Sequence, residues 1–258
     1  MVNLFNGATY PFRALGYLAR NPQLWGFVIV PILVNIIVAA VLYVGLLAGG
    51  FAAIDNVVVD TGWGDVLEGL LRLVLVVGLL IVAGFLLVRF GVVLGSPWYG
   101  KLSERIEADK LGSAPPAEPL TPRGIARDLG RALSFELKKL ALFLLIGGLL
   151  LLVNVIPVAG QIIAAVGWVL LGDWIACLDF FDGPQERRRL RFREKLANVR
   201  RALPGSAGFG LVAFGLVSIP FVNLLAIPLC VAAGTLFFCD HVRANQMVSA
   251  AETKRLPV

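Results

Sequence analysis

Two long apolar runs in the first half of the chain constrain its fold more than any other feature. The first covers residues 24–48 and the second covers residues 70–97. Neither run alternates apolar with polar residues, as an amphipathic strand or a barrel wall does. Each is longer than the roughly 20 helical residues that cross the hydrocarbon core of a bilayer. The sequence therefore predicts transmembrane helices over 24–48 and 70–97, and an all-α integral membrane protein.

Composition supports a membrane protein and gives little support to an enzyme. The chain is 58% hydrophobic and 16% charged, whereas soluble domains carry about 25% charged residues. Cys177, Cys230 and Cys239 lie within or beside apolar runs, and His241 is the single histidine, so neither a disulfide framework nor a zinc site is indicated. No Gly-rich phosphate loop is present. We expect no metal, no cofactor, no ATP hydrolysis and no enzymatic reaction.

Two further pairs of apolar segments predict helical hairpins, over 140–178 and 208–239. The two pairs resemble each other weakly, because an Ile-Pro dipeptide lies at the turn of each, at Ile156-Pro157 and at Ile219-Pro220. Some arms are shorter than the roughly 20 residues of a full crossing. The hairpins are therefore expected either to cross a thin bilayer with little tilt or to penetrate it only part way.

Basic residues predict the orientation of the chain. The segment 99–139 and the segment 183–204 are rich in Lys and Arg, and the loop between the first two apolar runs is acidic. The positive-inside rule places basic segments in the cytoplasm, together with both termini. Residues 99–139 are interpreted as a cytoplasmic amphipathic segment, in which Thr121-Pro122 opens a helix. Residues 183–204, called the arginine-rich segment below, raise the alternative of nucleic-acid binding. Beside membrane hairpins, however, phospholipid is the nearer polyanion.

Two acidic residues after the second run bear on enzymatic chemistry. Glu104 and Glu107 lie three positions apart, the spacing of neighbours on one helix face. Without a nucleophile or a metal constellation they do not indicate a general acid and base. They are interpreted as ion-pair partners of Lys101, Arg105 or the arginine-rich segment.

Four strings stand out along the chain: QLWGFVIVPILVN at 23–35, GSPWYGKLSERIE at 95–107, IPVAGQ at 156–161 and DGP at 182–184. Together they resemble the CysZ sulfate-permease family, which is related to the etoposide-induced membrane proteins of eukaryotes. The strings follow one another in the family's order and extend the resemblance over nearly the whole chain. The resemblance implies a bacterial inner-membrane homo-oligomer that passes sulfate inward, with two spanning helices and two hairpins that dip partly into the bilayer.

The resemblance also implies an anion site at the start of the first long helix. There the family has a Gly-hydrophobic-Arg-Arg string after a proline, and this chain has Trp25 and Gly26 in place of the two arginines. Unpaired N–H groups at a helix start still bind anions, and Arg20 is a candidate replacement, although it is also placed to reach lipid head groups. The candidate anion-binding residues are Arg20, Gln23, Leu24, Trp25 and Gly26.

Polar residues at membrane depth are candidates for an anion pathway. Asn35 lies in the first run and Arg89 in the second. The alternative for Asn35 is a hydrogen bond between helices, and for Arg89, as for Asp173, it is pairing or reaching to the head groups near a helix end. The sequence thus predicts an anion-conducting permease for sulfate or a similar oxyanion, with a non-transporting membrane-organising or scaffold protein as the alternative.

Overall fold

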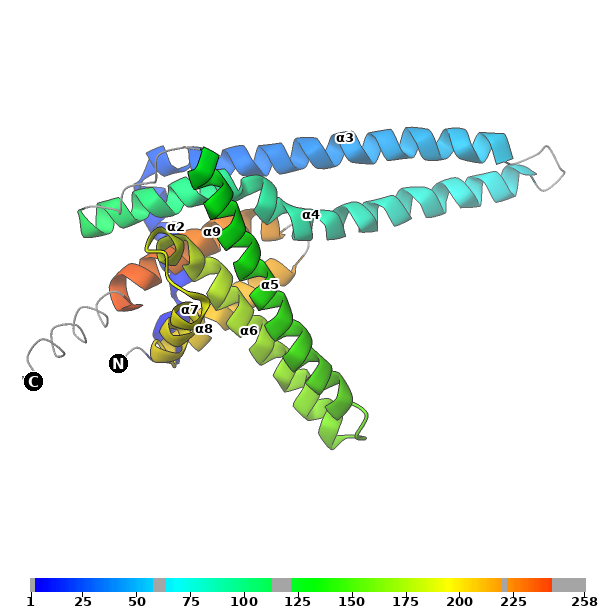
Figure 1. Ribbon diagram of the computed structural model, residues 1–258. Coiled ribbons are helices and arrows are strands. Elements are labelled where there is room, and N and C mark those ends of the chain that lie inside the picture. Colours follow the sequence, from blue (N-terminus) through cyan, green and yellow to red (C-terminus); the bar gives the residue numbers. More distant parts are fainter. Residues whose placement is uncertain (1–2, 58–63, 113–121, 220–221, 243–258) are drawn as a thin grey trace, which may run out of the picture.

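The computed structural model describes residues 3–57, 64–112, 122–219 and 222–242, and every regular element among them is helical. Its shape is that of a base from which two arms extend in different directions (Figure 1). The all-α class predicted from the sequence is confirmed. The elements are α1 (Leu4–Ala8), α2 (Tyr10–Arg20), η1 (Pro22–Leu24), α3 (Gly26–Val57), α4 (Gly64–Leu111), α5 (Pro122–Val153), α6 (Ala159–Arg187), α7 (Phe192–Arg201), α8 (Gly205–Ser218), α9 (Val222–Phe237) and η2 (Phe238–Val242).

Helices α3 and α4 form the longer arm as an antiparallel pair (Figure 1). Along it the Tyr43 hydroxyl donates to the Val76 carbonyl at 3.2 Å, and Arg72 pairs with Asp55 at 2.7 Å near the far end. Most of the outer surface is exposed and apolar, with Val41 66% and Ile81 67% exposed. A surface of this kind is stable in lipid and costly in water. The arm corresponds to the two predicted transmembrane runs.

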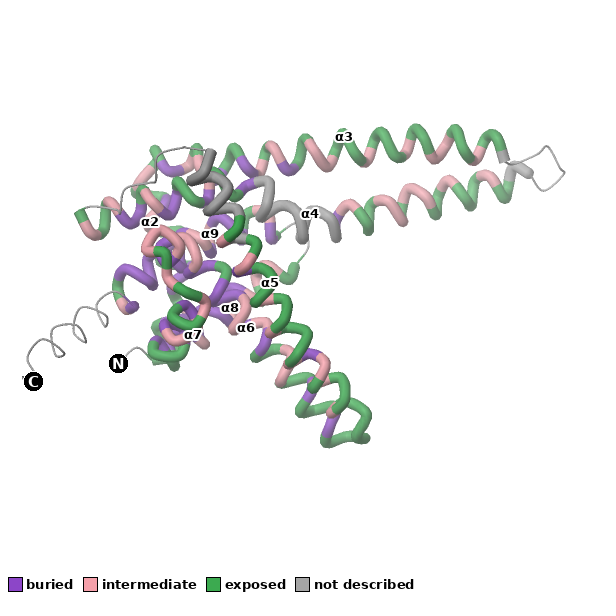
Figure 2. The backbone as a smooth tube through the Cα atoms, viewed as in Figure 1, coloured by how far each residue is buried: buried purple, intermediate pink, exposed green. Residues whose placement is uncertain are grey.

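Helices α5 and α6 form the second arm, a hairpin whose end away from the base is also apolar and exposed (Figure 2). By length and composition, four helical segments among the described residues are long and apolar enough to cross a membrane. They are Pro22–Asn56, Val66–Gly84, Ala159–Arg187 and Val222–Val242. The apolar part of α5 is not among them, in line with the short arm that the sequence indicated.

Two boundaries predicted from the sequence are wrong. The sequence predicted that Gly95-Ser96-Pro97 ends the second apolar helix, but α4 continues through Pro97 to Leu111 and is 48 residues long. A proline removes only one backbone hydrogen bond, and neighbouring helices compensate for it in a packed membrane protein. The predicted cytoplasmic segment 99–139 is accordingly not a separate element, because its start belongs to α4 and its end to α5. The first helical position of α5 is Pro122, as predicted.

The core lies in the base, where α2, α6, α8 and α9 meet (Figure 2). Phe181 of α6 stacks on Phe237 of α9 with ring centroids 5.1 Å apart, and on Phe209 of α8 at 5.0 Å. Tyr10 of α2 meets Phe237 edge-on at 5.0 Å. Aromatic contacts of this geometry add stability beyond the area that they bury. The segments far apart in sequence are thus fixed to one another in the base.

The second predicted hairpin, α8 and α9, packs into this core and does not form an exposed arm. Small residues make that possible, because helix backbones approach closely only where side chains are small. A Cβ at Gly208 of α8 would lie 1.8 Å from the Leu4 carbonyl oxygen, and one at Gly7 would lie 1.8 Å from the Gly205 carbonyl oxygen. The short helix α1 therefore lies directly against the backbone of α8.

Candidate anion-binding site

The five predicted anion-site residues meet where α2 ends and α3 begins. Leu24 is buried and Trp25 is half-buried, whereas Arg20, Gln23 and Gly26 are exposed. The turn is held from within: the Trp25 Nε1–H donates to the Leu18 carbonyl at 3.1 Å. Trp25 therefore stabilises the turn, at a position where the resemblance implies an arginine.

The start of α3 retains some of the hydrogen-bond donors that an anion site needs. The first N–H groups of a helix lack partners within the helix, and the helix dipole favours negative charge there. Arg20 ends α2 immediately before this turn and forms no ion pair with another described residue. The N–H groups of Trp25, Val28 and Ile29 already bond to carbonyls of the turn. The donors left for an anion are therefore the guanidinium of Arg20 and the N–H groups of Gly26 and Phe27, where the resemblance implies two guanidinium groups.

Of the two predicted pathway residues, the structure describes the side chain of one. Asn35 is buried in α3, 1% exposed. The side chain of Arg89 lies outside the described residues. Asp173 of α6 is also buried, and its Oδ1 accepts no hydrogen bond from the described residues. It lies against Gly210 of α8.

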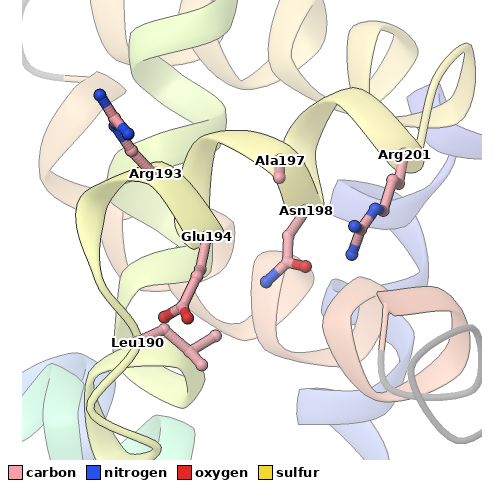
Figure 3. Close-up of a pocket in the computed structure, with 6 residues that line it drawn as sticks. All are labelled: Leu190, Arg193, Glu194, Ala197, Asn198 and Arg201. Carbon is pink, nitrogen blue, oxygen red and sulfur yellow. The ribbon is translucent and has the colours of Figure 1, made fainter. Parts of the chain in front are cut away.

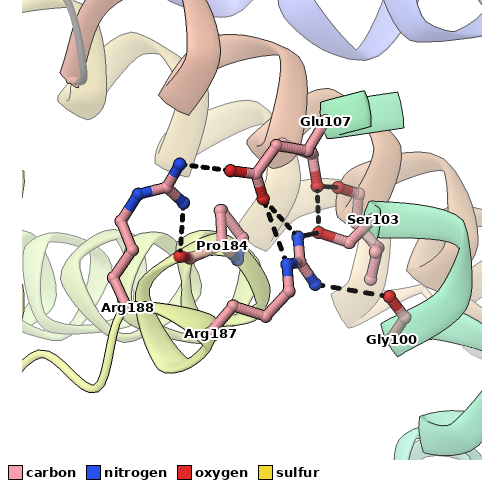
Figure 4. Close-up of polar contacts among 8 residues, drawn as sticks. Gly100, Ser103, Glu107, Pro184, Arg187 and Arg188 are labelled. Atoms are coloured by element: carbon pink, nitrogen blue, oxygen red, sulfur yellow. Dashed lines mark hydrogen bonds and ion pairs between the residues drawn. The ribbon is translucent and has the colours of Figure 1, made fainter. Parts of the chain in front are cut away.

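A buried ion-pair cluster in the base was missed as a candidate site. The Glu107 side chain is 0% exposed and accepts from both Arg187 and Arg188 (Figure 4). Arg187 donates to Glu107 Oε2 through Nη2 at 2.7 Å and through Nε at 3.1 Å. Arg188 binds the other carboxylate oxygen, Oε1. The sequence offered Lys101, Arg105 or the arginine-rich segment as partners of Glu107, and the structure shows the last of these.

Further hydrogen bonds tie the cluster to three helices. Arg187 Nη2 also donates to Ser103 Oγ at 2.8 Å, and the Thr235 hydroxyl of α9 donates to the same oxygen at 2.8 Å. Arg188 Nη1 donates to the Pro184 carbonyl at 2.8 Å. Two guanidinium groups face one carboxylate, so the cluster carries one positive charge in excess. Since Arg187 and Arg188 remain 15% and 17% exposed, that charge attracts anions to this part of the base.

Further ion pairs connect α5, α6 and α7. Lys195 is 2% exposed and binds Asp182 at 2.5 Å and Glu186 at 2.7 Å. Closer to the second arm, Lys139 binds Asp179 at 2.6 Å and Glu136 at 2.9 Å. These contacts use the acidic residues of the base internally, which leaves other arginines without an acidic partner.

The anion-site turn and the ion-pair cluster belong to the same end of the molecule. The Tyr17 hydroxyl of α2 donates to Asp109 Oδ2 at 2.5 Å, and Asp109 lies two residues beyond Glu107 on α4. Burial, together with the hydrogen bond and the charge of Asp109, raises the pKa of the Tyr17 hydroxyl above its ordinary value. Tyr17 therefore stays protonated and links α2 to the cluster-bearing end of α4.

The chain matches the family model described as sulfate transporter CysZ/etoposide-induced protein 2.4 over residues 10–228. This match includes both the α2–α3 turn and the ion-pair cluster. The chain belongs to this family. The sulfate transporter CysZ of Salmonella typhimurium is 30% identical over 237 residues, which are 92% of this chain and 93% of the relative. The CysZ proteins of Salmonella typhi and Salmonella gallinarum match to the same extent.

Membership in the CysZ family makes the chain a multi-pass membrane protein of a bacterial transporter family, whose role is not enzymatic. Within the described residues, no three His, Cys, Asp or Glu side chains come together as ligands for a metal ion. The chemistry that these residues offer is the binding of anions by guanidinium groups and backbone N–H groups.

Proposed function

We propose that this chain carries a small inorganic oxyanion, sulfate or a similar one, through a permease of the bacterial inner membrane without hydrolysing ATP. The relatives that cover 92% of the chain are sulfate transporters by name. The observation that carries the proposal is the exposed start of α3, with Arg20 beside it, at the position where the resemblance implies that sulfate binds. An oxyanion has the charge and the acceptor atoms that suit both groups.

The remaining polar residues fit a path for that anion. Arg20 with the exposed Gln23 and Gly26 forms the anion-binding site at the cytoplasmic end of that path, and Leu24 and Trp25 stabilise the turn. Asn35 on α3 and, by its place in the sequence, Arg89 remain the polar residues proposed for the path along the longer arm. The excess positive charge of Arg187 and Arg188 raises the local anion concentration at the base.

The permease works as a homo-oligomer, with its basic base and both termini in the cytoplasm. The apolar surfaces of the two arms are larger than a monomeric soluble protein exposes, and they are available to lipid and to other copies. The basic excess over α7 and over the turn before it supports the orientation.

Uptake of radiolabelled sulfate into vesicles that contain the purified full-length chain tests the proposal. Arg20→Ala is expected to raise the KM for sulfate about 10- to 100-fold, because a hydrogen bond to a charged group contributes about 1.5–3 kcal/mol. Arg13→Ala is the matched control, since Arg13 is another exposed arginine of α2, seven positions earlier. It is expected to leave uptake unchanged.

A second function, that of a non-transporting membrane-organising or scaffold protein, is favoured by one observation. Trp25 and Gly26 replace the two arginines of the family pattern, and the Trp25 indole is already used by the Leu18 carbonyl. The same vesicles separate the two functions. Absence of uptake for sulfate, thiosulfate and phosphate alike, from vesicles in which the protein is folded, refutes transport and supports the scaffold.

A further inference from the structure

Helix α7 and the turn before it carry arginines that the ion pairs of the base do not use. Four of them are exposed and form no ion pair with another described residue. They are Arg191, Arg193, Arg200 and Arg201. Arginines left in this state on one short helix create a positive surface directed outward.

The acidic residues near these arginines do not neutralise all of them. Glu186 is bound by Lys195 and by Arg131, at 2.7 Å and 3.2 Å. The carboxylate of Glu194 accepts the backbone N–H of Arg191 at 2.6 Å, which fixes it at the first turn of α7. Glu194 lines the groove and keeps its negative charge, which offsets one of the four arginines, so the surface of α7 retains an excess of positive charge.

A groove of about 300 Å³ runs along α7 between these arginines. Arg193, Ala197 and Arg201 are spaced four apart along the helix, and all three line the groove. Figure 3 shows Leu190, Glu194, Asn198 and Arg201 on one side of α7, whereas the guanidinium of Arg193 projects to the other side of the helix. Leu190 closes the groove at its apolar end, and the amide of Asn198, 3% exposed, forms part of its floor.

The place of α7 in the fold determines which anion is nearest. It begins five residues after the candidate span α6 ends, and α8, which is apolar, begins four residues after its last arginine. Its inner face packs on the base through Val199. A basic amphipathic helix beside the ends of apolar helices lies at the level of lipid phosphates.

We propose that the basic surface of α7 binds the phosphates of anionic phospholipids, with Arg201 at the groove and Arg193 on the neighbouring side of the helix each donating to phosphate oxygens. Guanidinium groups match phosphate oxygens with paired hydrogen bonds. The apolar Leu190 end of the groove accommodates the start of the acyl chains. This site is separate from the α2–α3 turn, and it depends on the chain being in a membrane and not on which anion it transports.

Native mass spectrometry of the purified full-length protein, titrated with phosphatidylglycerol or with phosphatidylcholine, tests the site. Phosphatidylglycerol is expected to bind more tightly than phosphatidylcholine. Each basic residue near an anionic lipid surface contributes about a fivefold preference, so the double variant Arg193→Ala/Arg201→Ala is expected to bind phosphatidylglycerol about 25-fold more weakly. The variant Arg193→Lys/Arg201→Lys keeps the charge and is expected to lose less.

The matched control is Arg105→Ala, which removes one exposed arginine from the end of α4 and is expected to change binding less than twofold. Unfolding temperatures in detergent establish that each variant is folded. Equal binding of the two lipids, or an unchanged affinity in the double alanine variant, overturns the proposal. Competitive displacement of phosphatidylglycerol by 10 mM inorganic phosphate also overturns it, because the groove is then a site for free anions.

Discussion

Neutralising Glu107 is expected to destabilise the base more than any other single loss of charge. In Glu107→Gln the shape of the side chain is kept, but Arg187 and Arg188 lose their shared carboxylate while 85% and 83% of each side chain remains covered. Removing one partner of a buried ion pair costs about 3–5 kcal/mol, since the other charge is left uncompensated. For a chain of this size 1 kcal/mol corresponds to about 2–4 °C, so the unfolding temperature is expected to fall by about 6–20 °C.

The assay is thermal unfolding of the purified protein in one detergent, at one scan rate, because unfolding of a membrane protein is often irreversible and then depends on the rate. Glu104→Gln is the control, since Glu104 lies one turn earlier on α4, is only half-buried and takes part in no ion pair among the described residues. It is expected to shift the unfolding temperature by less than about 2 °C. An equally small shift in Glu107→Gln would show that the carboxylate does not hold the two arginines in the folded protein.

Three further changes test other parts of the molecule. Trp25→Arg restores one arginine of the family pattern and is expected to lower the KM for sulfate uptake about tenfold through a charge-assisted hydrogen bond; an unchanged KM contradicts the anion site. Gly210→Ala places a Cβ 2.1 Å from Asp173 Oδ1, and we expect this overpacking to lower the free energy of unfolding by about 1–3 kcal/mol. The control is Gly215→Ala on the same helix, whose Cβ meets nothing within 4 Å; we expect it to leave the unfolding temperature unchanged. The raised pKa of Tyr17 stabilises the fold fully below pH 10 and progressively less as the pH rises above it, so the stability difference between the wild type and Tyr17→Phe should be constant from pH 7 to 10 and shrink above pH 10.

The long apolar helices and the first hairpin could be predicted because their signals are local. An apolar run of more than 20 residues has one stable structure in a bilayer, so 24–48 and 70–97 were sufficient to define the longer arm. The helix start at Pro122 was equally local, since proline is compatible with the first turn. The same reasoning failed at Pro97, because the sequence does not show whether neighbouring helices compensate for the lost hydrogen bond.

Contacts between distant residues could not be predicted in the same way. Glu107 and Arg187 are 80 positions apart, and the sequence offered several basic partners for that carboxylate. The burial of α8 and α9 was also missed, although the small residues Gly208, Gly210 and Gly234 marked faces where another helix comes close. An apolar helix in lipid and one in a protein core have the same composition, so only the packing distinguishes them.

Because α4 is continuous, it acts as a lever between the bilayer and the base. Its apolar run ends at Pro97, and the helix continues for 14 residues to Leu111, a distance of about 20 Å. A transmembrane helix changes its tilt when the thickness of the bilayer changes. A tilt of about 10° displaces the far end of a rigid rod of that length by about 3.5 Å, more than the length of the hydrogen bonds between Arg187 and Glu107. The thickness of the membrane is thus a mechanical load on those bonds.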